Sequence, residues 1–310
     1  MTSTLTPHMA ASNGARDFIG YGNSLPQVRW PGNARVAVSF VVNFEEGAEF
    51  SMTDGDDHNE GVYEVIDPQP VPDRCIDSHF EYGTRVAYWR IAGLFAQHGP
   101  YTLSACGHAV ERSPWLAQHA AAQGNEISGH GWRWEKGIDL TLDQERTAIA
   151  RTRDAILTAT GRAPVGWHTR SNATIHTRSL LVEKGFLYDS DAYNDDTPYV
   201  LDVSGQRHVV LPYSFDTNDM QFQNTQRFAN GQDFSDYVCA AYDWLWREGE
   251  HVPRMLSIGL HLRMIGRPGR IAALEQILQH LQAKGGAWIT TREQIARHWL
   301  GATESAQIKL

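Results

Sequence analysis

At three places in this sequence titratable residues stand where apolar segments end, and together they could supply a base and an acid. The apolar run at residues 36–44 ends in the adjacent Glu45 and Glu46. Neighbouring carboxylates repel each other, so the pKa of one can be raised toward that of a base while the other holds a cation or a hydrogen-bond donor. A second apolar run ends at His261, an imidazole that titrates near neutral pH. This combination is typical of general acid–base catalysis in a hydrolase.

A third candidate is His130, in the segment Gly129-His130-Gly131-Trp132-Arg133-Trp134. A histidine here could take part in the chemistry, or it could be a core residue hydrogen-bonded to a backbone carbonyl. Trp132 and Trp134 offer flat apolar faces that suit a planar ring ligand, although core packing explains them as well.

The elements that must position these residues alternate between short strands and amphipathic helices. Strands are predicted at residues 35–43, 101–106, 126–128, 165–168, 186–189, 208–212, 255–261 and 287–289, and helices at 85–97, 113–123, 141–160, 175–184, 233–248, 270–283 and 291–300. Repeated βα units predict an α/β fold with a mostly parallel sheet, and this many units close most easily as a barrel. The candidate residues then fall at carboxyl ends of strands, where barrel enzymes hold their active sites.

Three stretches depart from this alternation. Residues 1–33 are rich in Pro, Gly, Asn and Ser, which predicts an N-terminal arm lying on the domain or on a neighbouring subunit, ahead of a single catalytic domain at residues 34–310. Residues 48–82 and 190–232 are long for barrel loops, and long loops without regular structure are typical of lids and binding loops. We expect both to cover the mouth of the barrel.

Composition limits the partners. A net charge of -9 without a block of Lys or Arg argues against nucleic acid and anionic membranes, so a small molecule is the expected partner. Three cysteines without CxxC spacing indicate neither a disulfide framework nor a thiolate zinc site. No apolar run approaches a membrane span or a secretory signal, so we expect a cytoplasmic protein.

Several short motifs resemble those of one enzyme superfamily. They are Asn43-Phe44-Glu45-Glu46-Gly47, Glu81-Tyr82-Gly83-Thr84-Arg85, Tyr188-Asp189-Ser190-Asp191, Asp195-Asp196-Thr197-Pro198-Tyr199, Asp216-Thr217-Asn218-Asp219-Met220 and the residues around His261. This set resembles the polysaccharide deacetylase (NodB-homology) superfamily, and within it the branch that contains the ring-opening allantoinases and cyclic imide hydrolases. The resemblance implies a distorted (β/α) barrel and a homo-oligomer, a tetramer.

The resemblance also implies roles for the candidate residues. Glu45 takes the place of the catalytic base, His261 that of the catalytic acid, and Glu46 and His130 those of two metal ligands. Trp134 stands where the superfamily has a second metal histidine, and an indole cannot bind a metal. The cofactor is therefore either one divalent metal such as zinc, held by an incomplete set of ligands, or none.

Three further residues are candidates for binding the substrate: Arg85, His168 and Arg170. Arg85 could equally begin a helix and pair with Glu81, and Arg170 could pair with Asp189 or Asp191. The segment His168-Thr169-Arg170-Ser171 differs from the Tyr-Thr-Gly-Arg pattern of the allantoinases that it resembles, so allantoin and simple imides have nearly equal weight.

The expected function is hydrolysis of a cyclic amide C–N bond in a small ring, either a hydantoin or an imide. Deacetylation of N-acetylated sugar or peptidoglycan fragments is the alternative enzyme activity. A barrel that binds a ligand without turning it over is the alternative outside catalysis.

Overall fold

One curled sheet organises the molecule, and the computed structural model describes it at residues 16–18, 20–22, 25–61, 69–170, 172–223 and 228–307. Its strands are β1 (Val36–Phe44), β2 (Thr102–Ala105), β3 (Glu126–Gly129), β4 (Gly166–Trp167), β5 (Tyr188–Asp189), β6 (Tyr199–Val203), β7 (Gln206–Val210), β8 (Arg254–His261) and β9 (Ala287–Ile289). The strand order is β6-β7-β5-β4-β3-β2-β1-β8, with β9 paired to β1. Every pairing is parallel except that of β6 with β7.

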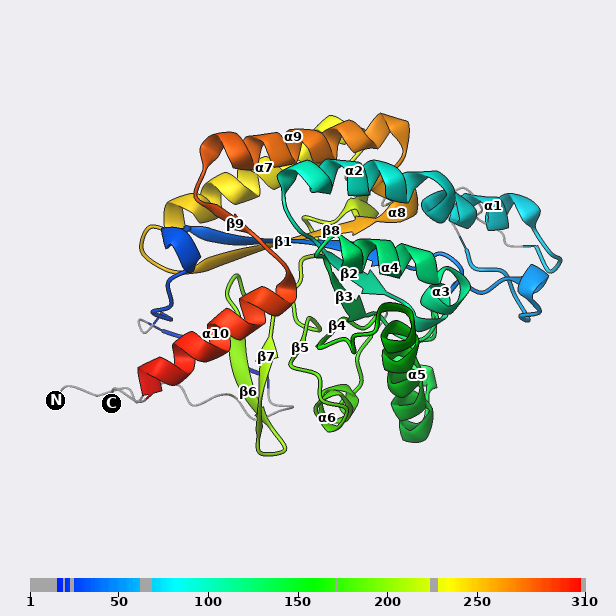
Figure 1. Cartoon of the computed structure of the whole chain (residues 1–310), viewed down its shortest axis with the longest axis horizontal. Coiled ribbons are helices and arrows are strands. Elements are labelled where there is room, and N and C mark those ends of the chain that lie inside the picture. Colours follow the sequence, from blue (N-terminus) through cyan, green and yellow to red (C-terminus); the bar gives the residue numbers. More distant parts are fainter. Residues whose placement is uncertain are drawn as a thin grey trace.

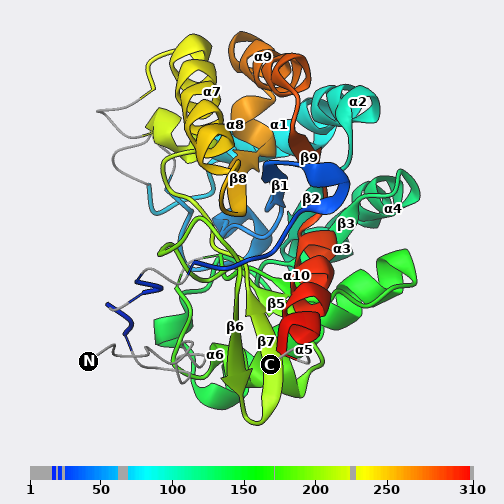
Figure 2. The same ribbon diagram turned by 90° about the vertical axis from the view of Figure 1, so that its left-hand side faces the viewer.

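Helices cover the outside of this sheet. They are α1 (Arg74–Tyr82), α2 (Tyr88–His98), α3 (Gly107–Arg112), α4 (Pro114–Ala122), α5 (Leu142–Thr160), α6 (Thr177–Glu183), α7 (Gly231–Glu248), α8 (Leu262–Ile265), α9 (Pro268–Lys284) and α10 (Arg292–Gln307). Figures 1 and 2 both show α2, α7 and α9 together on one side of β1 and β8, whereas α5, α6 and α10 lie toward the β6–β7 hairpin.

Strand β1 is the most enclosed element of the sheet. It pairs with β8 along its length, with β9 at its start and with β2 at its end, and all nine of its residues are buried. The main apolar core packs around it from β2, β8 and helices α2, α7 and α9. A continuous run of apolar residues is what a parallel strand covered on both faces requires.

The two segments expected to be long loops contain regular structure, so that expectation was wrong: residues 48–82 end in α1, and residues 190–232 hold a further strand beside the one predicted at 208–212. The second segment includes a hairpin. It contains β6 and β7, joined by a two-residue turn in which Ser204 and Gly205 have φ values of 55° and 78°. Positive φ at both positions is the geometry that a tight hairpin prefers, and the Asp202 side chain accepts a hydrogen bond from Gly205 N at 2.9 Å. The Ser-Gly pair was the signal for this turn.

The helix predicted at residues 85–97 is part of a longer helical segment. Between α1 and α2 the backbone forms one π-helical turn, η3 (Gly83–Ala87). Short π segments of this kind often occur at functional sites. Among the described helices, none is long and apolar enough to cross a membrane.

The described part of the N-terminal arm lies on the barrel. The Trp30 ring is buried against Trp288 and Trp299, and its Nε1 donates to Arg254 O at 2.8 Å. Further out, the hydroxyl of Tyr21 donates to Asp195 Oδ2 at 2.8 Å. Residues 1–15 lie outside the described part of the chain.

Candidate active site

The candidate site lies at the carboxyl ends of β1, β3, β4 and β8. Glu45 follows β1, His130 follows β3, His168 follows β4, and His261 ends β8. Strands β1 and β8 are neighbours, with Asn43 opposite His261, so the two candidate proton-transfer residues come from adjacent strands. Because parallel strands all end at the same edge of the sheet, residues more than 200 positions apart in sequence meet here.

The guanidinium of Arg263 lies between the two adjacent carboxylates. Its Nη1 is 2.9 Å from Glu45 Oε2 and 3.4 Å from Glu46 Oε1, and all three side chains are almost fully buried. Glu46 also accepts hydrogen bonds from the backbone N–H groups of Glu45 and Arg263, both at 3.2 Å. Burying two carboxylates together is unfavourable without a nearby cation, and Arg263 supplies it.

The environment separates the pKa values of the two carboxyl groups. Burial alone would raise the pKa of Glu45, but Arg263, the hydrogen bond from His130 and the nearby His261 hold it well below its usual range. Burial outweighs the effect of Arg263 on Glu46, and with the repulsion from Glu45 it raises the pKa of Glu46. Glu45 is therefore the ionised member of the pair.

His130 is held from both sides of its ring. Its Nδ1 lies 2.6 Å from the carbonyl oxygen of His168, and its Nε2 lies 3.3 Å from Glu45 Oε1. A carbonyl can only accept, so Nδ1 is the donor in this hydrogen bond. His130 is thus hydrogen-bonded to a backbone carbonyl on one side of its ring and lies beside Glu45 on the other.

The carboxylate of Asp219 holds the imidazole of His261 in place. Its Nδ1 lies 2.7 Å from Asp219 Oδ1, and Asp219 Oδ2 accepts the backbone N–H of His261 at 2.8 Å and that of Ile265 at 3.1 Å. Burial alone would lower the pKa of His261, but Asp219 and Glu45 outweigh it and raise the pKa above the ordinary value. His261 is therefore suited to carry a proton and give it up.

Two of the predicted substrate-binding residues reach the same place. The guanidinium of Arg170 stacks 3.6 Å from the centre of the Trp134 ring, and its Nε is 3.9 Å from Glu45 Oε1. The His168 ring lies 4.2 Å from that of Tyr213 and 5.0 Å from that of His130. Burial, then the charge of His130, holds the pKa of His168 well below its usual range, so this imidazole is neutral.

Both ring nitrogens of His168 are buried without a hydrogen-bond partner among the described residues. Such nitrogens are costly to bury unless water or a ligand satisfies them.

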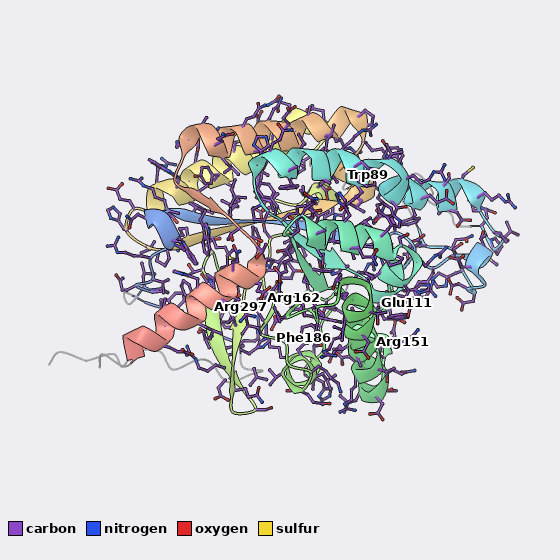
Figure 3. All side chains as sticks on the ribbon, in the orientation of Figure 1. Trp89, Glu111, Arg151, Arg162, Phe186 and Arg297 are labelled. Carbon is purple, nitrogen blue, oxygen red and sulfur yellow. The ribbon has the colours of Figure 1, made fainter. Side chains whose placement is uncertain are left out.

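Two predicted site residues lie elsewhere. Arg85 is exposed on η3, and no contact between its side chain and the carboxylates is seen among the described residues. Trp132 packs between α3 and α5, where the guanidinium of Arg151, labelled on α5 in Figure 3, lies 3.7 Å from the centre of its ring. Asp189, one of the expected partners of Arg170, contacts Arg178 at 2.8 Å and His208 at 3.0 Å.

Sequence reasoning missed three residues of the site: Arg263, Asp219 and Gly83. Arg263 stands two positions after His261, and Asp219 lies within a motif noted only for its resemblance. Gly83 belongs to the same motif as Arg85, and a Cβ on it would collide with the carboxylate of Glu46. The signal was the motif itself, whose glycine gives the carboxylate room.

The two residues expected to bind a metal ion have other partners. Glu46 faces Arg263 and backbone N–H groups, whereas His130 faces Glu45. In the described part of the chain, no group of three or more His, Cys, Asp or Glu side chains is arranged to hold a metal ion. The guanidinium of Arg263 would also oppose a divalent cation beside these carboxylates. The residues present therefore do not fit a zinc site.

Comparison with known proteins supplies the family. A Schizosaccharomyces pombe protein, provisionally named a polysaccharide deacetylase, is 38% identical over 309 residues, which cover 92% of this chain and 96% of the relative. The family model for polysaccharide deacetylases matches residues 69–184. The chain belongs to the polysaccharide deacetylase family. It is thus a hydrolase of that family, whose members act on C–N bonds.

Two solved structures of this family are very similar to the chain. The crystal structure of PuuE allantoinase has a TM-score of 0.86 and 42% identity, and the match covers 92% of this chain and 96% of the allantoinase. A Pseudomonas aeruginosa protein, provisionally named a polysaccharide deacetylase, has a TM-score of 0.87 and 44% identity over 92% of this chain and 97% of its own. The prediction of a distorted barrel of the polysaccharide deacetylase type is confirmed, as a curled mixed sheet that forms a half-barrel.

Proposed function

We propose that this polysaccharide deacetylase family member opens a cyclic amide in a small ring, a hydantoin such as allantoin or a cyclic imide. The observation that carries this proposal is the pairing of an ionised Glu45 with a proton-bearing His261 on adjacent strand ends in a buried site. An amide needs both groups, because its nitrogen is a poor leaving group until it is protonated.

The proposed reaction begins with water. Glu45 accepts a proton from the water molecule as its oxygen attacks the ring carbonyl carbon, which gives a tetrahedral oxyanion. Arg170 supplies a fixed positive charge beside Glu45 to stabilise this oxyanion. His261 then gives its proton to the ring nitrogen as the C–N bond breaks, and Asp219 stabilises the imidazolium until that step.

The surroundings of the carboxylates favour a flat ring over a polymer. Glu45, Glu46, His130 and Trp134 are each at most 6% exposed, which leaves little room for a chain that must run through an open groove. Trp134 and Arg170 form a flat stacked pair, and the neutral imidazole of His168 can both donate to and accept from a ring that presents N–H and C=O groups. The likeness to PuuE allantoinase supports the same substrate class.

Turnover with three substrates tests the proposal: allantoin, succinimide and N-acetylglucosamine oligomers. We expect one of the rings to be preferred in kcat/KM over the oligomers by about a thousandfold or more, which corresponds to about 4 kcal/mol of transition-state discrimination. Acetate release from the oligomers that is faster than opening of either ring would replace the proposal with deacetylation.

Glu45→Gln and His261→Ala are the control proteins for that assay. Each should lower turnover by about two to four orders of magnitude, the usual contribution of a positioned acid or base. If purified wild-type protein binds a ring without opening it, the chain is a ligand-binding barrel.

A further inference from the structure

The segment that carries His168 and Arg170 is held from behind by a carboxylate that does not face the catalytic residues. Thr169 lies between them, and its backbone N–H donates to Asp191 Oδ1 at 2.7 Å. The Thr169 hydroxyl donates to Asp191 Oδ2 at 2.6 Å and accepts from Trp167 Nε1 at 3.0 Å. Both oxygens of Asp191 therefore hold one residue, and that residue is flanked by two side chains of the site.

Asp191 is itself fixed by a buried ion network. Its backbone N–H donates to Asp189 Oδ1 at 2.9 Å, and Arg178 Nη2 donates to its carbonyl oxygen at 3.4 Å. Asp189 is fully buried between Arg178 Nε at 2.8 Å and His208 Nε2 at 3.0 Å. A buried carboxylate that is hydrogen-bonded to an arginine and a histidine holds its geometry closely, so the network gives Asp191 a rigid support.

The same segment also fixes His130. The carbonyl oxygen of His168, directly before Thr169, accepts the short hydrogen bond from His130 Nδ1. The position of the Thr169 backbone thus bears on three side chains: His168, Arg170 and His130. Strand β4, which leads into the segment, has only two residues and little strand pairing of its own to fix the chain beyond its end.

We infer that Asp191 is a positioning residue for the reaction, because its carboxylate fixes Thr169 and thereby sets where His168 and Arg170 meet the substrate. The inference rests on the proposed function for the identity of that substrate. Asp191 touches neither the substrate nor the reacting atoms, and it acts through Thr169. Burial, followed by the charge of Asp189, raises the pKa of Asp191 to about 7, in line with a carboxyl group enclosed for a structural purpose.

Paired substitutions test this positioning role. Thr169→Val removes the hydroxyl donor with little change of shape, Asp191→Asn replaces one acceptor oxygen, and Thr169→Ser keeps the hydroxyl. We expect the first two to lower kcat/KM for the ring by about tenfold or more, because a displaced Arg170 lowers kcat and a displaced His168 raises KM. Thr169→Ser should keep kcat/KM near the wild-type value. The double variant should be no worse than Asp191→Asn alone, because both changes break one interaction.

Thr177→Val is the matched control. Its hydroxyl makes an equivalent buried hydrogen bond to Glu145 Oε1 at 2.5 Å, at the start of α6, and no contact of this hydroxyl with the site residues is seen in the described part of the chain. This variant should lower the melting temperature while leaving KM unchanged. If Thr169→Val behaves like Thr177→Val, or if the two losses at Thr169 and Asp191 simply add, the inference is overturned.

A second readout does not need a substrate. The proton on His130 Nδ1 sits in a 2.6 Å hydrogen bond, so NMR should detect it as a slowly exchanging low-field resonance. We expect Thr169→Val and Asp191→Asn to shift this resonance and speed its exchange, and Thr177→Val to leave it in place. An unchanged resonance in both site variants contradicts the positioning role, whereas failure of the wild-type protein to open any ring contradicts only the proposed function.

Discussion

At the scale of single residues, the site depends on the Arg263 guanidinium, which contacts both Glu45 and Glu46. Arg263 touches both carboxylates and is 3% exposed, so its charge acts mainly on Glu45 and Glu46. The resemblance supplied the roles of the two carboxylates, but the residue that makes Glu45 the ionised one comes from a different strand end. A contact across 218 positions of sequence cannot be obtained from local patterns.

Substitution of Arg263 should therefore cost both stability and activity. Arg263→Met leaves two buried carboxyl groups without their cation, which raises the pKa of Glu45 and removes its ionised form near neutral pH. We expect a loss of about 3 to 5 kcal/mol in unfolding free energy, the usual result of breaking a buried ion pair. Urea denaturation measures it, with Arg85→Met as the exposed control. Equal stability of the two variants would show that Arg263 does not hold the pair together.

The Asp219–His261 pair predicts the pH dependence of turnover. Since the pKa of His261 is raised, the imidazole keeps its proton below that pKa and loses it above, so kcat should fall as pH rises through it. Glu45 should cause no loss near neutral pH, because its pKa lies well below the usual range. Asp219→Asn should shift the fall of kcat to lower pH, because it removes the carboxylate that raises the pKa of His261. Asp216→Asn changes a nearby exposed residue and should leave the profile unchanged. A pH–rate profile that is identical in all three proteins contradicts this assignment.

At the scale of elements, the sequence predicts the strands and long helices well because their signals are local. Apolar runs, capping residues and the glycines that end helices locate β1, β8, α5 and α9 within a few residues. The missed elements include α1, which lies in the segment expected to be a loop at residues 48–82 although Asp73 caps its first turn. They also include β6, which forms by pairing with β7, and α8, a single turn after His261. The motif pointed to Gly83, but the π turn that begins there was not predicted, and neither was the close approach of the Glu46 carboxylate to this glycine.

Gly83 predicts a contrast between two glycines of one helical segment. Gly83→Ala places a methyl group against the Glu46 carboxylate, so it should destabilise the protein by about 1 to 3 kcal/mol and lower activity. Gly93→Ala, in α2, meets nothing within 4 Å and should be neutral or stabilise by up to about 1 kcal/mol. Thermal unfolding of both variants checks the difference, and equal effects would mean that Glu46 can move aside.

At the scale of the whole molecule, the donor set predicts how turnover responds to chelators. The carboxylates are satisfied by Arg263 and backbone N–H groups, and His130 faces Glu45, so we expect EDTA treatment and dialysis to leave kcat/KM within about twofold of the untreated protein. Elemental analysis of the same samples is the control. Lost activity that returns only with added zinc would show that the side chains rearrange around an ion.

An exposed aromatic pair on the outside of the barrel is a candidate contact surface for the expected tetramer. Trp89 and Trp115 stack at 5.4 Å on α2 and α4 while remaining 50% and 38% exposed, and Figure 3 labels Trp89 on this face. Exposed apolar area of this kind is typical of contact surfaces. We expect light scattering to give about four times the 34.8 kDa chain mass, and Trp89→Ser to reduce it. A single-chain mass at micromolar concentration would rule the tetramer out.

Strands β1 and β4 differ in length and pairing, so the two parts of the site that follow them should differ in resistance to local unfolding. Glu45 follows β1, which is hydrogen-bonded to three other strands. The amide protons of β1 should therefore exchange with solvent only when the whole chain unfolds. His168 and Arg170 extend from the two-residue β4, so side-chain contacts such as those of Asp191, and little strand pairing, hold this segment in place. At moderate urea concentrations the segment of His168 and Arg170 should therefore unfold first. Activity should then be lost while Glu45 and His261 are still in their native positions.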